Sequence, residues 1–415
     1  MAANPNTLTA NFPYYWSRRQ QIKRAKETVY QDIASFEEKA TLVKGVRVYR
    51  PYRSDLVVKT LGADGSYSRQ ALTDTEQHLD IDIEKEVSFY VRDPDQAQSN
   101  YKIANSYADD AAKRCGEYID GEVLGEYDTA SSVIGNYEMG GGGSASDGIG
   151  FTLTTSNVMQ VFGKANRKLD RKHVPRKNRW AVISPEFFDV LWQFIGGKES
   201  ALGDKVGTNP NEIGIYGGFR LFISEQTGWS ARLEMATIAT DTDTITINGV
   251  VFTADGDGAA VGAGHFSIQA SATLCCGQLA DAINNAEGYA ASEGAVDTYI
   301  EVTEANRKKL AGITAVFTAG NEYLELKGEG VGYIVVSETL TPAGDIWTTT
   351  KQLQHNLFGQ GKPIDLVVQK YPKLEIKDRS GYVGKDFVTW FLMGLKTFNE
   401  GKDALVDAQI RSDAF

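Results

Sequence analysis

Apolar and polar residues alternate most regularly in an early part of the chain. In residues 78–93, HLDIDIEKEVSFYVRD, the apolar Leu79, Ile81 and Ile83 alternate with acidic residues. Val87 and Phe89 continue the period of two. This alternation predicts a pair of strands with one buried and one solvated face. Residues 44–70 also alternate and are broken by the turn GADG at 62–65, which predicts a projecting β-hairpin with little core of its own.

The spacing of apolar residues changes to three and four after Asp93. It predicts one long helix that ends near Tyr127, with Cys115 as a small buried residue on its apolar stripe. Shorter patterns predict a helix over 155–168, a strand over 179–183 and a helix over 185–195. These elements indicate a mixed α+β chain.

The second half of the chain also predicts mixed structure. TITINGVVFTADG (244–256) is expected to be a strand, and the helix that follows HFSIQ has Leu274, Leu279, Ala282 and Ile283 on one face. Further strands are expected over 298–303, 312–318, 322–327 and 332–337. Near the C-terminus, KDFVTWFLMGLKTF, NEGKD and ALVDAQIR predict a hairpin. The late strands need partners, and those at 78–92 are the natural candidates.

Charge is distributed unevenly along the chain. Residues 231–345 hold sixteen Asp and Glu against five Lys and Arg, a balance of −11 that equals the net charge of the whole chain. This block also lacks tryptophan, although the chain has six. The change in composition predicts a separate α+β domain, here called the acidic insert, within a nearly neutral host.

The overall composition is that of a globular protein. The length of 415 residues suits two or three domains, and 42% hydrophobic with 23% charged residues is ordinary. No apolar run is long enough to span a membrane. The N-terminus lacks a secretory pattern, and three cysteines cannot form a disulfide framework. We therefore expect folding in a reducing, cytoplasmic environment and no membrane partner.

A search for chemistry in the sequence finds no complete site. No histidine has a neighbouring His or Cys at metal-ligand spacing, and the glycine-rich loop 136–150 lacks the ending of a phosphate-binding loop. Asp255-Gly-Asp257 resembles the start of a calcium loop, but Phe266 stands where a glutamate is needed. The sequence therefore predicts no metal, no cofactor and no catalytic residue.

Ser184 in VISPEFFDVLWQF (182–194) has the one local context that suggests a nucleophile, at a turn from strand to helix. Its flanks lack the glycines of a hydrolase elbow. Ser184 followed by Pro185 and Glu186 instead matches the residues that begin a helix. We interpret Ser184 as a helix cap.

Three basic clusters are candidates for contacts with partners. One lies in the N-terminal segment and includes Arg18, Arg19 and Arg24, and one lies on the predicted hairpin, with Arg47, Arg50 and Arg53. The third is a predicted loop, which contacts nucleic acid or an acidic neighbouring subunit, or is simply a solvated turn. Its basic residues are Lys164, Arg167, Lys168, Arg171, Lys172, Arg176, Lys177 and Arg179.

The order of these elements resembles a known family. LTDTEQHLDIDIEKEVSFYVRDPDQAQS looks like a strand pair entering a spine helix, VISPEFFDVLWQF like the strand and helix of an axial domain, and IGIYGGFRLFISEQ like the turn and strand that follow. Together they resemble the major capsid protein of tailed bacteriophages, with the Hong Kong 97 fold and closest to podovirus-type coat proteins. The resemblance covers residues 1–230 and 346–415, and the acidic insert resembles small surface domains of phage virion proteins.

The resemblance implies a division of the chain into parts. Residues 1–40 would be an N-terminal arm and 44–70 an E-loop, both reaching a neighbouring subunit. Residues 71–125 with 364–415 would form the peripheral domain, and 126–230 with 346–363 the axial domain. Some relatives cross-link a lysine of the E-loop, for which Lys59 would be the candidate, but no partner is identified and we predict no cross-link.

The implied function is structural. The chain would assemble as pentamers and hexamers, with scaffolding and portal proteins, into the icosahedral shell of a virion that encloses double-stranded DNA, with a cement protein as a further partner. An encapsulin-type compartment is the alternative within the fold. A surface adhesin that binds through the acidic insert is the alternative from another class.

Overall fold

The fold is described from a computed structural model of the chain. It describes residues 26–37, 45–53, 56–61, 63–93, 103–144, 147–196, 214–256, 262–268, 271–284, 299–318, 322–341, 346–378 and 383–412. The chain forms two compact units. The first comprises residues 1–25, 84–115 and 371–391, and the second comprises 26–83, 116–370 and 392–415. The division into five parts that the family resemblance implies stays a prediction.

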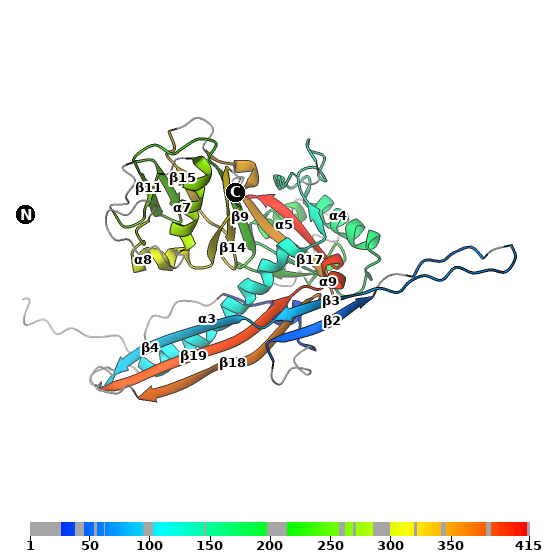
Figure 1. The fold of residues 1–415 in the computed structure, drawn as a ribbon, viewed down its shortest axis with the longest axis horizontal. Coiled ribbons are helices and arrows are strands. Elements are labelled where there is room, and N and C mark those ends of the chain that lie inside the picture. Colours follow the sequence, from blue (N-terminus) through cyan, green and yellow to red (C-terminus); the bar gives the residue numbers. More distant parts are fainter. Residues whose placement is uncertain are drawn as a thin grey trace, which may run out of the picture. The chain divides into compact units, whose positions relative to one another are not determined.

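The first unit holds most of β4 (Ile83–Arg92) and parts of β18 (Ile364–Asp378), β19 (Gly384–Lys396) and α3 (Ile103–Gly125). The strands are neighbours in the order β18-β19-β4 (Figure 1). Phe89 of β4 stacks on Phe387 of β19 with ring centroids 5.0 Å apart, and it lies 5.6 Å from the Tyr107 ring of α3. These contacts hold the early strand against the late one, as the sequence predicts.

The second unit is built on a sheet of ten strands, with its main path in the order β13-β14-β9-β17-β6-β8-β7. β20 pairs with β17 and with β5, and β16 pairs with β9. The bounds are β5 Ser132–Ile134, β6 Arg179–Ile183, β7 Ile215–Tyr216, β8 Phe219–Ile223, β9 Gly228–Glu234, β13 Ile313–Phe317, β14 Tyr323–Gly328, β16 Ile346–Trp347, β17 Leu353–Gln360 and β20 Leu405–Arg411.

Two helices pack on the centre of this sheet, α4 (Val158–Arg171) and α5 (Pro185–Gly196). Phe162 of α4 and Phe187 of α5 are fully buried and meet Phe358 of β17 edge to face, at 5.5 and 6.4 Å between centroids. Edge-to-face aromatic pairs add to the stability from burial alone. The predicted helix–strand–helix segment therefore lies in one apolar core with the C-terminal strands.

The remaining elements complete the second unit. They are α1 Tyr30–Ile33, β1 Ala34–Ser35, β2 Arg47–Arg53, β3 Asp74–Asp80, the 3₁₀ turn η3 Glu126–Thr129, β10 Thr244–Ile247, β11 Val250–Asp255, β12 His265–Ser267, α7 Ala272–Asn284, α8 Glu304–Arg307, η5 Lys308–Leu310, β15 Val336–Glu338, η6 Thr349–Lys351 and α9 Asn399–Asp403.

The predicted E-loop hairpin is longer than the sequence suggests. β2 pairs antiparallel with β3 from Arg47 opposite Asp80 to Arg53 opposite Asp74. The hairpin therefore runs from 47 to 80 and not from 44 to 70. The two early strands predicted as a pair, β3 and β4, belong to different sheets. The alternation is right, but a period of two does not say which strand is the partner.

The predicted hairpin at the C-terminus is wrong in the same way. β19 and β20 are neighbours in no sheet, because β19 pairs with β18 and β4 while β20 pairs with β17 and β5. The segment NEGKD between them forms the short helix α9. This helix turns the chain from one sheet into the other.

The acidic insert leaves and re-enters the large sheet at one point. Glu234 at the end of β9 lies opposite Ile346 at the start of β16. Between these residues the chain builds the four-stranded sheet β12-β11-β10-β15 and, with α7, a core that also includes Trp229 and Leu233 of β9. β14 also pairs with β9, so the acidic insert extends the host sheet and is not separate from it.

Two details inside the acidic insert differ from the prediction. TITINGVVFTADG forms a hairpin of β10 and β11, because Asn248 and Gly249 both take positive φ (50° and 71°) in the two-residue turn. Leu274, expected on the buried face of α7, is 53% exposed. The other expected residues of that face, Leu279, Ala282 and Ile283, are buried.

This geometry defines a test of the insert boundary. We expect a chain in which residues 235–345 are replaced by Asn-Gly to fold, because a two-residue turn can join paired positions such as 234 and 346. Its melting temperature should fall, since Trp229 and Leu233 lose the core that now covers them. Circular dichroism and calorimetry check this, and a non-cooperative melt would contradict it.

Candidate assembly surfaces

The first described segment of the N-terminal arm is held by one buried carboxylate. Asp120 of α3 is fully buried, and its Oδ1 accepts the backbone N–H groups of Val29 and Tyr30, each at 2.7 Å. Its Oδ2 accepts from Nε2 of Gln226 at 2.8 Å. Burial raises the pKa of Asp120, and these donors oppose that rise. The carboxylate therefore joins the arm, the helix and the turn between β8 and β9.

The acidic insert reaches the same place. Lys26 donates from Nζ to the carbonyl of Gly330 at 2.8 Å and from its backbone N–H to Glu117 at 2.7 Å. Gly330 packs so closely on Gly121 of α3 that an added Cβ would lie 2.8 Å from the Gly121 Cα. Because that distance is to backbone, neither glycine has room for a side chain. Arm, helix and acidic insert therefore meet in direct contact.

Several carboxylates lie together beside this contact. Burial, and then the nearby Glu122, raise the pKa of Glu329 to about 7, while Lys327 opposes the rise. Asp128 and Glu126 add further negative charge, and burial also raises the pKa of Glu126. The pKa of Glu329 is thus higher in the folded than in the unfolded chain.

This gives a prediction about pH. Between pH 4.5 and 7 the folded state holds a proton on Glu329 that the unfolded state loses, so its contribution to stability falls as pH rises and is lost above about 7. The free energy of unfolding of the Glu329→Gln variant should depend less on pH between 4.5 and 7. At pH 8 the variant should be more stable than the unchanged chain by about 1–2 kcal/mol, after allowance for solvent screening. Urea unfolding at pH 5 and 8 measures it. If the free energy of unfolding changes between pH 5 and 8 by the same amount in the variant as in the unchanged chain, the prediction is contradicted.

The loop that joins β2 to β3 presents apolar side chains to solvent. In Figure 1 this loop extends away from the sheets of its own unit. Six of its apolar side chains are exposed by 63 to 98%: Leu56, Val57, Val58, Leu61, Tyr67 and Leu72. Several exposed apolar side chains in one loop are typical of an interaction site. Lys59 lies among them and donates to the Arg69 carbonyl at 3.5 Å.

The three arginines predicted to contact a neighbour from this hairpin differ in their surroundings. Arg50 pairs with Asp365 at 3.1 Å and with Glu400 at 3.4 Å, and Arg47 pairs with Asp80. Both arginines therefore form ion pairs within this chain that stabilise the base of the hairpin. Arg53 is exposed. Arg18, Arg19 and Arg24 lie outside the described residues.

The sequence predicts a loop over the basic segment 164–179, but only part of this segment is a loop. Its first four basic residues belong to α4, which continues to Arg171. Lys168 pairs with Glu138 at 2.9 Å and Lys172 with Asp403 at 2.7 Å. Lys164 is half-buried, whereas Arg167, Arg171 and Lys177 are exposed, and no ion pair within the described chain holds them.

Arg179 does not belong to this exposed surface. Its side chain is 1% exposed and pairs with Asp170 at 2.7 Å, and it also donates to Asn166 and to the carbonyls of Val174 and Pro175. Arg176 shares the Asp170 carboxylate at 2.7 Å, and together the two arginines lower the pKa of Asp170. Arg179 therefore closes the turn after α4, and its predicted contact with a partner is wrong.

Ser184 caps α5. Its hydroxyl accepts the backbone N–H of Phe187 at 3.2 Å, three residues on, and donates to Oε1 of Gln354 at 2.8 Å. Its backbone N–H is bound by Asn356 at 2.7 Å. The fully buried hydroxyl is thus committed to the start of the helix.

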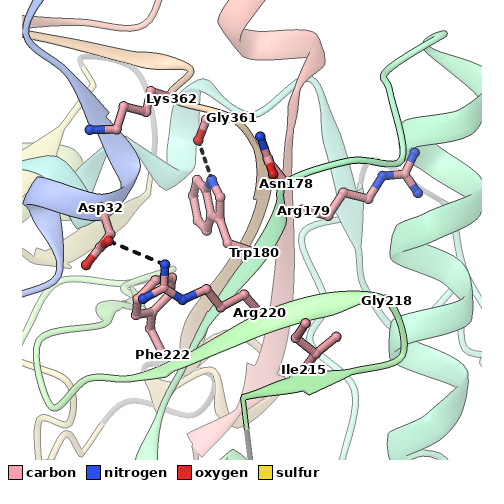
Figure 2. Close-up of a pocket in the computed structure, with 10 residues that line it drawn as sticks. All are labelled: Asp32, Asn178, Arg179, Trp180, Ile215, Gly218, Arg220, Phe222, Gly361 and Lys362. Carbon is pink, nitrogen blue, oxygen red and sulfur yellow. Dashed lines mark hydrogen bonds and ion pairs between the residues drawn. The ribbon is translucent and has the colours of Figure 1, made fainter.

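A pocket of about 450 Å³ opens where α1 approaches the large sheet (Figure 2). Arg220 pairs with Asp32 at 3.6 Å, and Trp180 donates from Nε1 to the carbonyl of Gly361 at 2.8 Å. Lys362 stands at the rim and donates to the Gln31 carbonyl. Both cationic groups of this pocket therefore already have a partner within the chain.

One group of three polar side chains is marked by no local pattern in the sequence. Ser230, His355 and Asp407, distant in sequence, form a chain of two hydrogen bonds across three strands. Only the sheet register brings them together, so no local motif marks them. Among the described residues no group of His, Cys, Asp and Glu has the arrangement of a metal site. Nor is any described helix long and apolar enough to cross a membrane.

Comparison with known proteins gives matches only among solved structures. No family model matches the chain, and no curated protein does. A chain of Mycobacterium phage Che8 has a TM-score of 0.56 at 14% identity and covers 98% of both chains. A chain from the capsid structure of cyanophage P-SCSP1u has a TM-score of 0.53 at 11% identity, covering 98% of this chain and 95% of that one.

A third structure, the mature capsid of bacteriophage PhiM1, has a TM-score of 0.50 at 8% identity and covers 97% of this chain and 92% of that one. This chain has the fold of phage capsid proteins. The Hong Kong 97 fold that the sequence resembles is thereby confirmed at the level of architecture.

Proposed function

We propose that this chain is the major capsid protein of a tailed bacteriophage, which assembles into an icosahedral shell around double-stranded DNA. The observation that carries the proposal is the match of nearly the whole chain to capsid structures. The exposed apolar hairpin supports it, because exposed apolar surface of this kind is typical of a site that a neighbouring subunit covers. In this proposal the protein assembles in the host cytoplasm and is then part of the virion capsid.

The roles of the parts follow from this proposal. The β2–β3 loop and the segment before Lys26 reach neighbouring subunits. Arg53, Arg167, Arg171 and Lys177 are the exposed basic groups that contact DNA or an acidic neighbour. Scaffolding, portal and cement proteins are the further partners of such a shell.

The acidic insert belongs on the outer surface in this proposal. All the excess negative charge of the chain lies in it. An outward position separates that charge from packaged DNA and keeps particles apart in solution. The β9 edge that it covers keeps it fixed to the host sheet.

Negative-stain electron microscopy tests the proposal. The full chain is expressed alone and with the genes next to its own. We expect closed shells or rings of five and six subunits. A strictly monomeric protein under both conditions would overturn the proposal.

A further inference from the structure

We propose that Ser230 is a nucleophilic serine, activated by His355 and Asp407, that takes acyl groups from small carboxylic esters. A shell does not require this activity, and the inference stands apart from the proposed function. It rests on the register of three strands, the hydrogen bonds between the side chains, the cover over the histidine ring and the pocket in front of the serine.

The register places the three side chains on one face of the sheet. Ser230 of β9 lies opposite Leu353 of β17, and His355 is two residues further on. His355 lies opposite Gln409 of β20, and Asp407 is two residues away. Residues two apart share a face, and such diagonal neighbours lie within reach of a long side chain. The opposite face of β17 and β20 carries the apolar core.

The side chains make the contacts that a serine nucleophile needs. The His355 Nδ1 lies 2.8 Å from Oδ2 of Asp407, and its Nε2 lies 2.8 Å from Oγ of Ser230. The carboxylate accepts the proton on Nδ1, which leaves Nε2 free to accept the serine hydroxyl. Oδ1 of Asp407 has no hydrogen-bond partner in the described chain, so its carboxylate is bound through His355.

The histidine is shielded, whereas the serine is only partly buried. The His355 and Asp407 side chains are 3% and 2% exposed. The Tyr127 ring stacks on His355 with centroids 3.7 Å apart and an interplanar angle of 14°. Tyr127 fits there because residue 228 is glycine, where a Cβ would lie 2.3 Å from the tyrosine ring. Burial of the pair strengthens its hydrogen bonds and fixes the imidazole orientation.

The serine faces a pocket of about 300 Å³, which Ser230 and His355 both line. This volume is at the lower limit for small-molecule sites and suits a short acyl chain. Lys327, Lys351 and Arg232 line the same pocket. Asp147 and Glu325 line it too, and Lys327 and Arg232 are paired with Asp128 and Glu234. Lys351 is the remaining cation of the lining, and its charge favours the negative oxygen that forms during acyl transfer.

The proposed reaction is balanced by the groups present and water. Oγ of Ser230 attacks the ester carbon while its proton moves to Nε2 of His355. The bond to the alcohol then breaks, and the alcohol leaves with that proton. Water attacks the acyl-serine, giving its proton to His355, and the carboxylic acid leaves as Ser230 recovers its hydrogen.

The test uses a fluorophosphonate probe on the purified full chain, with intact mass and peptide mapping. We expect one adduct per chain, at Ser230. Labelling and hydrolysis of p-nitrophenyl acetate should fall at least about tenfold in Ser230→Ala, and also in Asp407→Asn, which disturbs the histidine tautomer. Ser88→Ala is the control, since this exposed serine bonds to Glu86 and not to a histidine.

Circular dichroism checks that each variant is folded. Whether Ser230 is a nucleophile is decided by the adduct on the unchanged chain alone. No adduct at Ser230, or labelling there no faster than at Ser88, would overturn the proposal. The three residues would then be a structural hydrogen-bond chain. Assembly is unaffected by either result, so failure here is distinct from failure of the shell function.

Discussion

Substituting Asp120 by alanine should lower the free energy of unfolding by about 3–5 kcal/mol, because three donors, two of them in buried hydrogen bonds, then lose their acceptor. The amides of Val29 and Tyr30 should lose protection from hydrogen exchange, since the arm segment is no longer held to α3. Urea unfolding and exchange mass spectrometry measure the two effects. Both effects together distinguish an anchor of the arm from general loss of packing.

Two comparisons control this result. Asp120→Asn keeps an acceptor for the amides and should cost less than the alanine variant. Glu304→Ala removes a carboxylate from an exposed pair with Lys308, which should change stability by less than about 1 kcal/mol. Unchanged protection of residues 29 and 30 in Asp120→Ala would show that the carboxylate does not anchor the arm.

The second large effect concerns assembly. Replacing Val58 and Leu61 by aspartate should abolish shells while the subunit stays folded. Both side chains are largely exposed, so the free subunit loses little. In a shell each lost apolar contact costs about 1.5–3 kcal/mol, enough to reduce each contact constant by about tenfold or more. Sedimentation velocity measures the particle fraction, and calorimetry the subunit.

The matched control is Leu274→Asp, which also places a charge at an exposed leucine, but on α7 of the acidic insert. If the acidic insert lies on the outer surface of the shell, the Leu274→Asp variant should form shells as the unchanged chain does. Normal shells from the Val58 and Leu61 double variant would contradict the role of the hairpin.

Local features of the fold were predictable from the sequence. The Ser184 cap and the buried stripe with Cys115 depend on residues that are near one another in the chain. Their patterns therefore predict the observed structure. The high positive charge of residues 164–179 predicts a loop, but the apolar Ala165 and Leu169 lie on the buried face of α4.

Pairing between distant strands was less predictable. β3 and β4 look like one hairpin, and β19 and β20 like another, yet each strand has partners elsewhere. Periodicity shows which face is buried and not which strand lies beside it. The same reason hid the contact of Ser230 with His355, which exists only through the register of β9 and β17.

Cryo-electron microscopy of particles from co-expression tests the central claim most directly. We predict an icosahedral map in which the β2–β3 hairpin lies on a neighbouring subunit and residues 235–345 lie on the outer surface. A map with these residues inside would contradict the proposed orientation. The absence of any closed particle, with a folded monomer in solution, would contradict the shell function itself.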